Sequence, residues 1–257
     1  MWERATQSLA AILLNVNAAG QPDVNGTAFI VENGPDGLFL LTNLHVVREE
    51  GNAADLFRKE KRVKVEFARP DIAVQEGVVV GADAIADLAL IKIDSTKASE
   101  IQRHRLASML ALPLGDSDAL VIGEELMPVG HPLGNRNNPT FARYTGQGPF
   151  TEDRLLVVRF NGSVSPGNSG GPLLRMNGEV VGINTAMLPA PAQVAYSIPS
   201  STIRKVILPQ LRRFEGKPHE RVRYGSLGVE LQSLTSELME VLGLPTRQGG
   251  IVTRVDP

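Results

Sequence analysis

The stretch LFLLTNLHVV, residues 38–47, places a short apolar run directly before a histidine. The run LFLLTN at 38–43 is too short for a typical helix, so it predicts a β-strand. His45 then lies at the end of that strand, at the edge of whatever sheet the strand joins. How often such runs recur decides the fold class of the chain.

Similar apolar runs recur between turn-forming segments. They cover 27–32, 63–67, 77–82, 88–93, 125–130, 155–160, 172–176, 180–185 and 194–198. The segment MNGE at 176–179 places Asn-Gly between two runs, which is the strongest short hairpin signal. The run at 8–16 predicts the first strand, entered through a helical turn. Ten or more short strands with little helix between them indicate an all-β protein, either a sandwich or a barrel.

Two segments carry a helical pattern. The first, at 48–61, predicts a short helix beside a loop. The second, at 200–214, is interrupted by Pro209, which predicts either a kinked helix or two pieces. Its apolar residues at helical spacing are Ile203, Val206, Ile207, Leu211 and Phe214.

The composition excludes several classes of protein. The 26 basic and 28 acidic residues are mixed along the chain, so neither a nucleic-acid nor a membrane partner is indicated. No apolar run approaches the roughly 20 residues of a membrane span, and the start of the chain carries no clear signal peptide. There is no cysteine, which rules out disulfides and a cysteine nucleophile. No ligand cluster has suitable spacing, so neither a metal nor an organic cofactor is expected.

The stretch PGNSGGPLL at 166–174 is the strongest chemical signal. Acyl transfer needs an exposed hydroxyl nucleophile and backbone N–H groups directed at the oxyanion that forms. Ser169 supplies the hydroxyl, and the glycines around it allow a tight turn. The Gly167 and Ser169 amides, with Asn168 between them, are the candidate oxyanion hole. The alternative interpretation is a glycine-rich turn with an incidental serine.

His45 is the candidate general base, because histidine exchanges protons near neutral pH. A lone histidine at a strand end is more often a packed residue. His104 lies in a basic stretch and His219 in a polar one, which leaves His131, in GHPLG, as the rival; a loop role is expected for it.

Asp87 directly precedes the apolar run at 88–93, where its carboxylate can be buried against the imidazole and fix its tautomer. A capping or solvated aspartate is the alternative interpretation, and Asp83 is the nearest competitor. The order is His45, Asp87, Ser169, with gaps of 42 and 82 residues. This order is typical of the chymotrypsin-like triad rather than of the subtilisin or α/β-hydrolase triads.

Seven motifs together resemble the HtrA/DegP branch of the trypsin-like serine proteases over residues 8–210. They are GTAFIV, LLTNLHVV, DLALIKI, LGDSD, GHPLG, PGNSGGPLL and GINT. The resemblance implies a chymotrypsin-like double β-barrel with a short C-terminal helix. A protease domain would cover 1–214, with barrels near 8–110 and 111–200 and the active site between them. A linker would follow at 215–223, and 224–257 resembles the start of a PDZ domain, cut short.

The resemblance also implies a serine endopeptidase that cleaves unfolded or damaged polypeptides. From the resemblance we expect a homo-oligomer, which in that family is a trimer. We also expect a periplasmic or otherwise exported location. Ser163 holds the position where trypsin-like enzymes that cut after Lys or Arg carry aspartate, so small to medium apolar residues are expected before the cut. The residues expected to bind substrate are Ser163, Val164, Ile183, Asn184 and Thr185.

Other functions remain open. A latent protease on the same fold would act mainly as a chaperone. A protein-interaction module would work through the peptide-binding groove of the tail. An esterase would use the same three residues.

Overall fold

The computed structural model describes residues 6–16, 22–35, 37–48, 61–131, 139–150, 156–162, 167–187, 194–209, 229–233, 243 and 250–255. The chain divides into two compact units, Met1–Val222 and Arg223–Pro257. The described residues of the first unit form twelve strands in two closed barrels, the first barrel from the first half of the unit's sequence and the second barrel from the second half.

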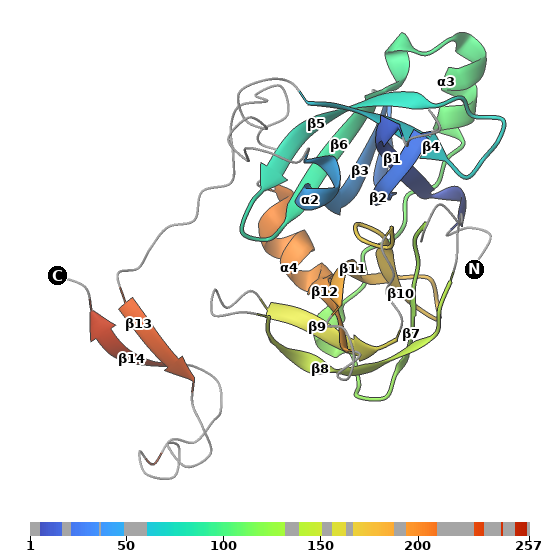
Figure 1. Ribbon diagram of the computed structural model, residues 1–257. Helices are drawn as coiled ribbons and strands as arrows, with labels where there is room; N and C mark the ends of the chain where they lie inside the picture. The colour runs from blue at the N-terminus through green and yellow to red at the C-terminus, as the bar shows by residue number, and fades with distance from the viewer. Residues whose placement is uncertain are drawn as a thin grey trace. The chain divides into compact units, whose positions relative to one another are not determined.

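The first barrel closes six antiparallel strands in the order β1-β2-β3-β6-β5-β4 (Figure 1). The run that opens the chain forms β1, and the stretch 38–43 forms β3, as the sequence predicted. The strands are β1 Leu9–Val16, β2 Pro22–Gly34, β3 Gly37–Asn43, β4 Arg62–Phe67, β5 Gln75–Asp83 and β6 Leu88–Asp94.

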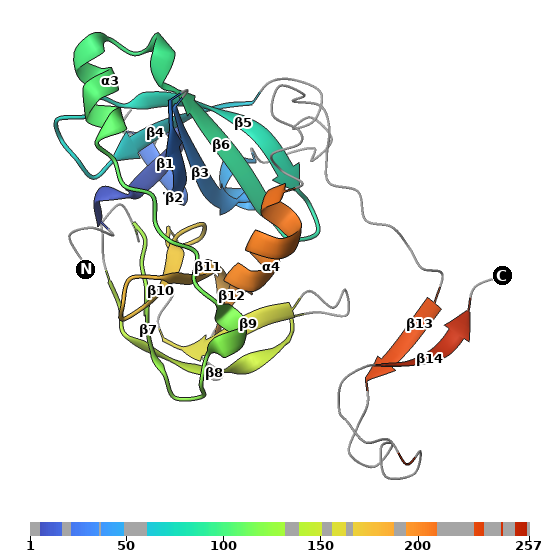
Figure 2. The ribbon, with the colours of Figure 1, turned by 180° about the vertical axis from the view of Figure 1, so that it is seen from behind.

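The second barrel closes in the order β10-β11-β12-β9-β8-β7, and it lies beside the first in both views (Figures 1 and 2). Its strands are β7 Glu125–Pro128, β8 Ala142–Pro149, β9 Leu156–Asn161, β10 Pro172–Arg175, β11 Val180–Met187 and β12 Val194–Pro199. The predicted all-β double barrel is therefore confirmed. The sequence did not predict β8.

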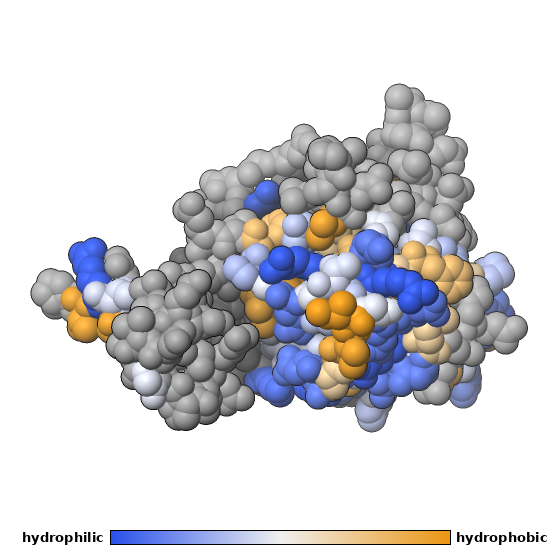
Figure 3. Space-filling model, turned by 90° about the horizontal axis from the view of Figure 1, so that it is seen from below, coloured by the Kyte–Doolittle hydropathy of each residue, from blue (hydrophilic) through white to orange (hydrophobic). Residues whose placement is uncertain are grey.

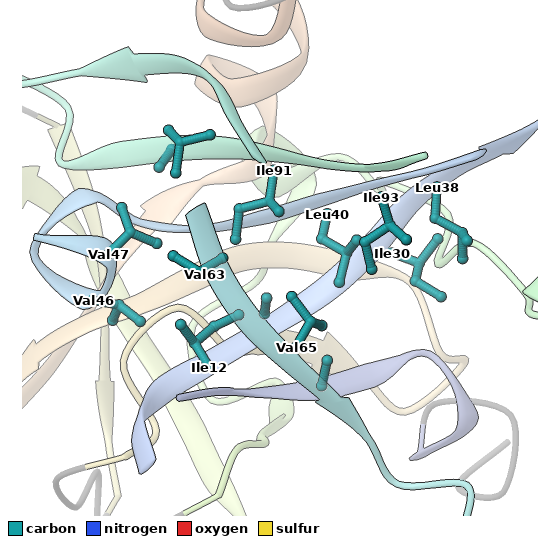
Figure 4. Close-up of a cluster of buried hydrophobic side chains, with 14 of the residues drawn as sticks. Ile12, Ile30, Leu38, Leu40, Val46, Val47, Val63, Val65, Ile91 and Ile93 are labelled. Atoms are coloured by element: carbon teal, nitrogen blue, oxygen red, sulfur yellow. The ribbon is translucent and has the colours of Figure 1, made fainter. Parts of the chain in front are cut away.

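The apolar runs are continuous because several strands are buried on both faces. Side chains of a strand alternate between its two faces. In β6, Ala89, Ile91 and Ile93 belong to the core inside the first barrel, which Figure 4 shows in part. Leu88 and Leu90 point the other way.

Leu88 and Leu90 join a second apolar core that contains residues of both barrels. The first barrel also gives it Leu9, Phe29, Leu41 and Val80; the second gives Met127, Val129, Leu174, Val180, Ile183 and Ile198. Burial of apolar side chains contributes roughly 1.5–3 kcal/mol for each large residue. This shared core therefore holds the barrels together and fixes how the residues at their junction face one another.

Short helices connect or follow the barrels. A single turn, α2 Leu44–Val47, follows β3, while η2 Ser95–Lys97 and α3 Glu100–Ala107 follow β6. Near the second barrel are η3 Ser117–Ala119, α4 Ser200–Thr202 and the π-helical η5 Ile203–Ile207. The helical pattern beginning at residue 200 is thus confirmed through Pro209, and the rest of it lies outside the described residues. The helix predicted at 48–61 falls on residues of which only 48 and 61 are described.

The second unit contains β13 Val229–Ser233, which pairs antiparallel with β14 Gly250–Val255. A two-stranded sheet alone is marginally stable in water. Among the described residues that are visible from below, most are hydrophilic, and the apolar ones lie in several small groups (Figure 3). No helix among the described residues is both long enough and apolar enough to cross a membrane.

Candidate active site

His45 and Asp87 are brought together by the pairing of β3 with β6. Asn43 at the end of β3 lies opposite Leu88 at the start of β6. The residues just outside these two ends are therefore neighbours. The His45 imidazole and the Asp87 carboxylate contact each other, with 2.7 Å between Nδ1 and Oδ2, and the His45 amide donates to Asp87 Oδ1 at 2.9 Å.

Asp87 has an unusual backbone, with φ at +52°. It is the one non-glycine residue with positive φ in the described part of the chain. Its carbonyl accepts hydrogen bonds from the Leu44 amide at 3.1 Å and from Asn43 Nδ2 at 2.9 Å. Such conformations cost about 1–3 kcal/mol and tend to lie at functional sites. The contacts with 43–45 compensate that cost and fix the carboxylate under the imidazole.

Ser169 lies in a turn between β9 and β10 of the second barrel. Gly167 and Gly170 adopt φ of +99° and +82°, which favour glycine. The Gly170 amide donates to Asn184 O at 2.9 Å, and the Thr27 amide of the first barrel donates to Ser169 O at 2.8 Å. A Cβ at Gly170 would overlap Thr27 O and Thr42 Oγ1, so only glycine fits between the barrels here.

Two amides of the turn have no acceptor among the described residues. Among the hydrogen bonds of the described residues, none has the Gly167 or the Ser169 N–H as its donor. The Asn168 side chain is buried and packs against Gly130, where a Cβ would approach its Oδ1 to 2.7 Å. The chemistry expected of the turn, two N–H groups for an oxyanion, is therefore sterically compatible with this backbone.

Thr185 on β11 links the two halves of the site. Its hydroxyl donates to Asp87 Oδ2 at 3.0 Å, and its carbonyl accepts from Ser169 Oγ at 3.4 Å. Ser169 and the His45–Asp87 pair thus lie on either side of one residue. In the described part of the chain no hydrogen bond joins Ser169 Oγ to the imidazole, and rotation about the serine Cα–Cβ bond would redirect that oxygen.

Two expectations for the site need correction. The His45 and Asp87 side chains are 42% and 31% exposed, so the carboxylate is only partly covered, although it contacts both the imidazole and Thr185. The Ile183 and Asn184 side chains are completely buried. Ile183 packs in the core between the barrels, while Asn184 Nδ2 donates to the carbonyls of Val129 and Pro172. Neither side chain is therefore exposed at the surface.

The remaining predicted substrate residues divide in two. Thr185 is partly exposed and lies at the site. Ser163 and Val164 lie outside the described residues.

The two rivals named from the sequence have other surroundings. His131 is 1% exposed, and its Nδ1 lies 3.3 Å from Thr27 Oγ1. Asp83 is fully buried, and its Oδ1 accepts hydrogen bonds from the amides of Ile85 and Ala86, both at 2.9 Å. Asp83 therefore shapes the turn that leads into Asp87. Within the described residues no group of three or more metal-binding side chains is present.

Two closed antiparallel barrels, with His45 and Asp87 on the first and Ser169 on the second, define the trypsin-like class of protein. The chain belongs to the trypsin-like peptidase domain family, whose model matches residues 26–183. The resemblance to the HtrA/DegP branch is confirmed by relatives. The chain is 32% identical to a probable periplasmic serine endoprotease, DegP-like, from Chlamydia trachomatis, and 29% identical to one from Brucella suis.

Those matches cover 90% of this chain but 41% and 40% of the relatives, so the chain spans about two fifths of their length. Among solved structures, the HtrA-type protease AlgW with a tripeptide superposes with a TM-score of 0.70 at 27% identity. That match covers 99% of this chain and 75% of the other. The serine endoprotease from Yersinia pestis gives 0.65 at 22% identity, a likeness of fold.

Proposed function

We propose that this protein is a serine endopeptidase in which His45, Asp87 and Ser169 form the catalytic triad. The observation that carries the proposal is the position of Thr185, which hydrogen-bonds both Asp87 and Ser169 and so joins the acid–base pair to the nucleophile. The DegP-like serine endoprotease relatives support the same activity.

The proposed mechanism runs through an acyl-enzyme. His45 Nε2 removes the proton from Ser169 Oγ as that oxygen attacks the scissile carbonyl. Asp87 accepts from His45 Nδ1–H and stabilises the imidazolium. The Gly167 and Ser169 amides hold the oxyanion. His45 then protonates the leaving amine, and water repeats the sequence on the acyl-enzyme, which regenerates Ser169.

Unfolded or damaged polypeptides, cut after small to medium apolar residues, are the proposed substrates. The serine at position 163 supports this preference, because a pocket without a fixed negative charge would bury a lysine or arginine at a high cost. The relatives are named periplasmic, which supports an exported location. The proposal for residues 224–257 is the beginning of a PDZ domain, and for the assembly it is a homo-oligomer.

The test compares wild type with Ser169→Ala on unfolded casein and with a fluorophosphonate probe. Wild type should hydrolyse casein and carry the probe on Ser169, and Ser169→Ala should do neither while keeping its melting temperature. Probe labelling without hydrolysis would identify a latent protease. If Ser169→Ala cleaved casein as fast as wild type, the proposed triad would be wrong.

A peptide library that varies the residue before the cut tests the specificity. Small to medium apolar residues such as Val, Ala and Leu should be favoured. A preference for Lys or Arg would contradict the proposal.

A further inference from the structure

Thr27 lies in β2 of the first barrel, yet its polar atoms are hydrogen-bonded to the Ser169 turn of the second barrel. The residue is fully buried. Its amide donates to Ser169 O at 2.8 Å, and its hydroxyl donates to Gly167 O at 2.7 Å. One residue of the first barrel therefore holds the carbonyls at both ends of the three-residue segment 167–169.

His131 completes the arrangement from the second barrel. Its amide donates to Thr27 Oγ1 at 3.0 Å and also approaches Gly167 O at 3.3 Å, while its Nδ1 lies 3.3 Å from Thr27 Oγ1. A hydroxyl has one donor and two acceptor positions. Gly167 O accepts the hydroxyl proton at the shortest distance, and the His131 amide and Nδ1 are the other two groups within hydrogen-bond reach of Thr27 Oγ1. The Thr27 hydroxyl is then fully satisfied.

The close approach of these segments needs Gly130. A Cβ at Gly130 would lie 2.6 Å from Asn168 Cα and 3.0 Å from Thr27 Oγ1. The chain from 130 to 131 thus packs directly against the turn. Thr27 itself is held by Thr42, whose hydroxyl donates to Thr27 O at 2.7 Å. The support of the turn is therefore rigid on both sides.

The consequence for catalysis follows from the planarity of the peptide bond. Fixing the Gly167 carbonyl fixes the plane that carries the Asn168 amide, and fixing the Ser169 carbonyl fixes the plane of the Gly170 amide. Between these two planes only the Asn168–Ser169 peptide is left, and its N–H is one proposed oxyanion donor. Such donors act only when they are already aimed at the forming charge.

We infer that Thr27 is a positioning residue of the proposed endopeptidase, acting across the barrel junction to orient the Ser169 turn through its hydroxyl. It touches neither substrate nor the reacting atoms. This inference rests on the proposed function, since it assigns Thr27 to the alignment of that same site. His131 is the second member of the arrangement, and its role is to hold the Thr27 hydroxyl directed at Gly167 O.

The experiment compares Thr27→Val with Thr27→Ser on a peptide substrate that wild type cleaves. Valine keeps the shape and removes the hydroxyl, whereas serine keeps the hydroxyl and removes a methyl group. Thr27→Val should lower kcat by about tenfold to a hundredfold, less than the loss of an oxyanion donor itself, with KM within about twofold of wild type. Thr27→Ser should restore kcat to within about threefold of wild type.

Ser200→Ala is the matched control. The Ser200 hydroxyl is also buried and donates to a backbone carbonyl, Gly115 O at 2.9 Å. Its loss should lower the melting temperature about as much as Thr27→Val and leave kcat unchanged. A Thr27→Val enzyme with wild-type kcat, or a Thr27→Ser enzyme as slow as Thr27→Val, would overturn the inference. If wild type cleaved neither a peptide nor unfolded casein and did not react with the fluorophosphonate probe, the proposed function itself would be refuted.

Discussion

At the scale of single residues, Asp87 combines an unusual backbone conformation with a side chain that the proposed chemistry requires. Its backbone occupies the left-handed region, and its carboxylate accepts from the His45 amide, His45 Nδ1 and Thr185 Oγ1. Asparagine tolerates positive φ better than most residues, so Asp87→Asn isolates the chemistry from the fold. A side-chain amide at this position can donate to the imidazole and favour the wrong tautomer.

The first prediction is that Asp87→Asn lowers kcat by about 10⁴-fold, the loss known for this change in chymotrypsin-like enzymes, while the melting temperature stays close to that of wild type. Steady-state kinetics and thermal unfolding measure the two quantities. Asp87→Val serves as the comparison, because a β-branched residue at positive φ should lose stability as well. Equal kcat for Asp87→Asn and wild type would show that the carboxylate is not needed.

Glycines in the left-handed region supply a second prediction, because two of them differ only in the space around them. Gly170 has φ of +82° and is enclosed by the first barrel, whereas Gly123 has φ of +88° with nothing within 4 Å of an added Cβ. Gly123→Ala should cost about 1–2 kcal/mol from backbone strain alone. Gly170→Ala should cost more than about 3 kcal/mol, since the obstructing Thr27 O is backbone and cannot rotate away. Thermal unfolding decides, and equal losses would contradict the argument.

The residues of the site were predictable to different degrees. His45, Asp87 and Ser169 could be named because each follows or precedes a recognisable strand or turn, in an order typical of one class of enzyme. Thr27 could not, since nothing in GTAFIV shows that its hydroxyl faces the other barrel. Ile183 and Asn184 were expected to bind substrate because the GINT segment resembles the protease family, and only the structure shows that both side chains are buried.

At the scale of elements, the strands were predictable where both faces are apolar. The strand β8 was not predicted because its sequence, ARYTGQGP, contains two glycines and few apolar residues. The Arg159 guanidinium lies against Gly148, where a larger residue would require that flexible side chain to move. The helix α3 was also not predicted, although Ser99 and Gln102 have the spacing of a capping box. Ser99 does cap Gln102 N, but the Gln102 side chain bonds the loop at 71–73 instead.

The helical segment formed by α4 and η5 contacts η3, before the second barrel, through a group of polar side chains. The contribution of this group to stability depends on pH. Ser201 Oγ donates to Asp118 Oδ1 at 2.6 Å, and Lys205 Nζ lies 3.2 Å from Asp118 Oδ2. The Ser201 hydroxyl, helped by Lys205, holds the pKa of Asp118 below its usual value. A carboxyl whose folded pKa is lowered stabilises the protein above its unfolded pKa, near 4, and this contribution disappears as the pH falls through the folded pKa.

The third prediction is that Asp118→Asn lowers the melting temperature at pH 7 by about 1–2 °C, corresponding to about 0.5 kcal/mol, because half of the Asp118 side chain is exposed and solvent screens its charge. As the pH falls through the lowered pKa of Asp118, the difference from wild type should shrink, because wild type then loses the same contribution. Ser201→Ala should likewise lower the melting temperature at pH 7 and reduce the loss of stability on acidification. The reason is that the Ser201 hydroxyl is the main cause of the lowered pKa of Asp118. A constant difference between Asp118→Asn and wild type at all pH values would exclude the linkage.

At the scale of the whole molecule, the proposed chemistry depends on two barrels that are separate in sequence. The acid–base pair comes from the first barrel and the nucleophile from the second, so the site exists only where the barrels meet. Two kinds of contact maintain that junction: the shared apolar core around Leu90 and Ile183, and the hydrogen bonds of Thr27 and Thr185. The core supplies most of the cohesion, whereas the directional bonds select one register of the two barrels.

The division of the chain after Val222 leads to the last prediction. Both closed barrels, their shared core and all described residues of the proposed site belong to Met1–Val222, and in the described part of Arg223–Pro257 β13 pairs with β14. A chain ending at Val222 should therefore unfold cooperatively within about 2 °C of the full chain and cleave a short peptide with a kcat within about twofold. Ser169→Ala in the shortened chain is the control that assigns the cleavage to this site. A large fall in both quantities would mean that Arg223–Pro257 stabilises the barrels, and a fall in kcat alone would mean that it acts on the site.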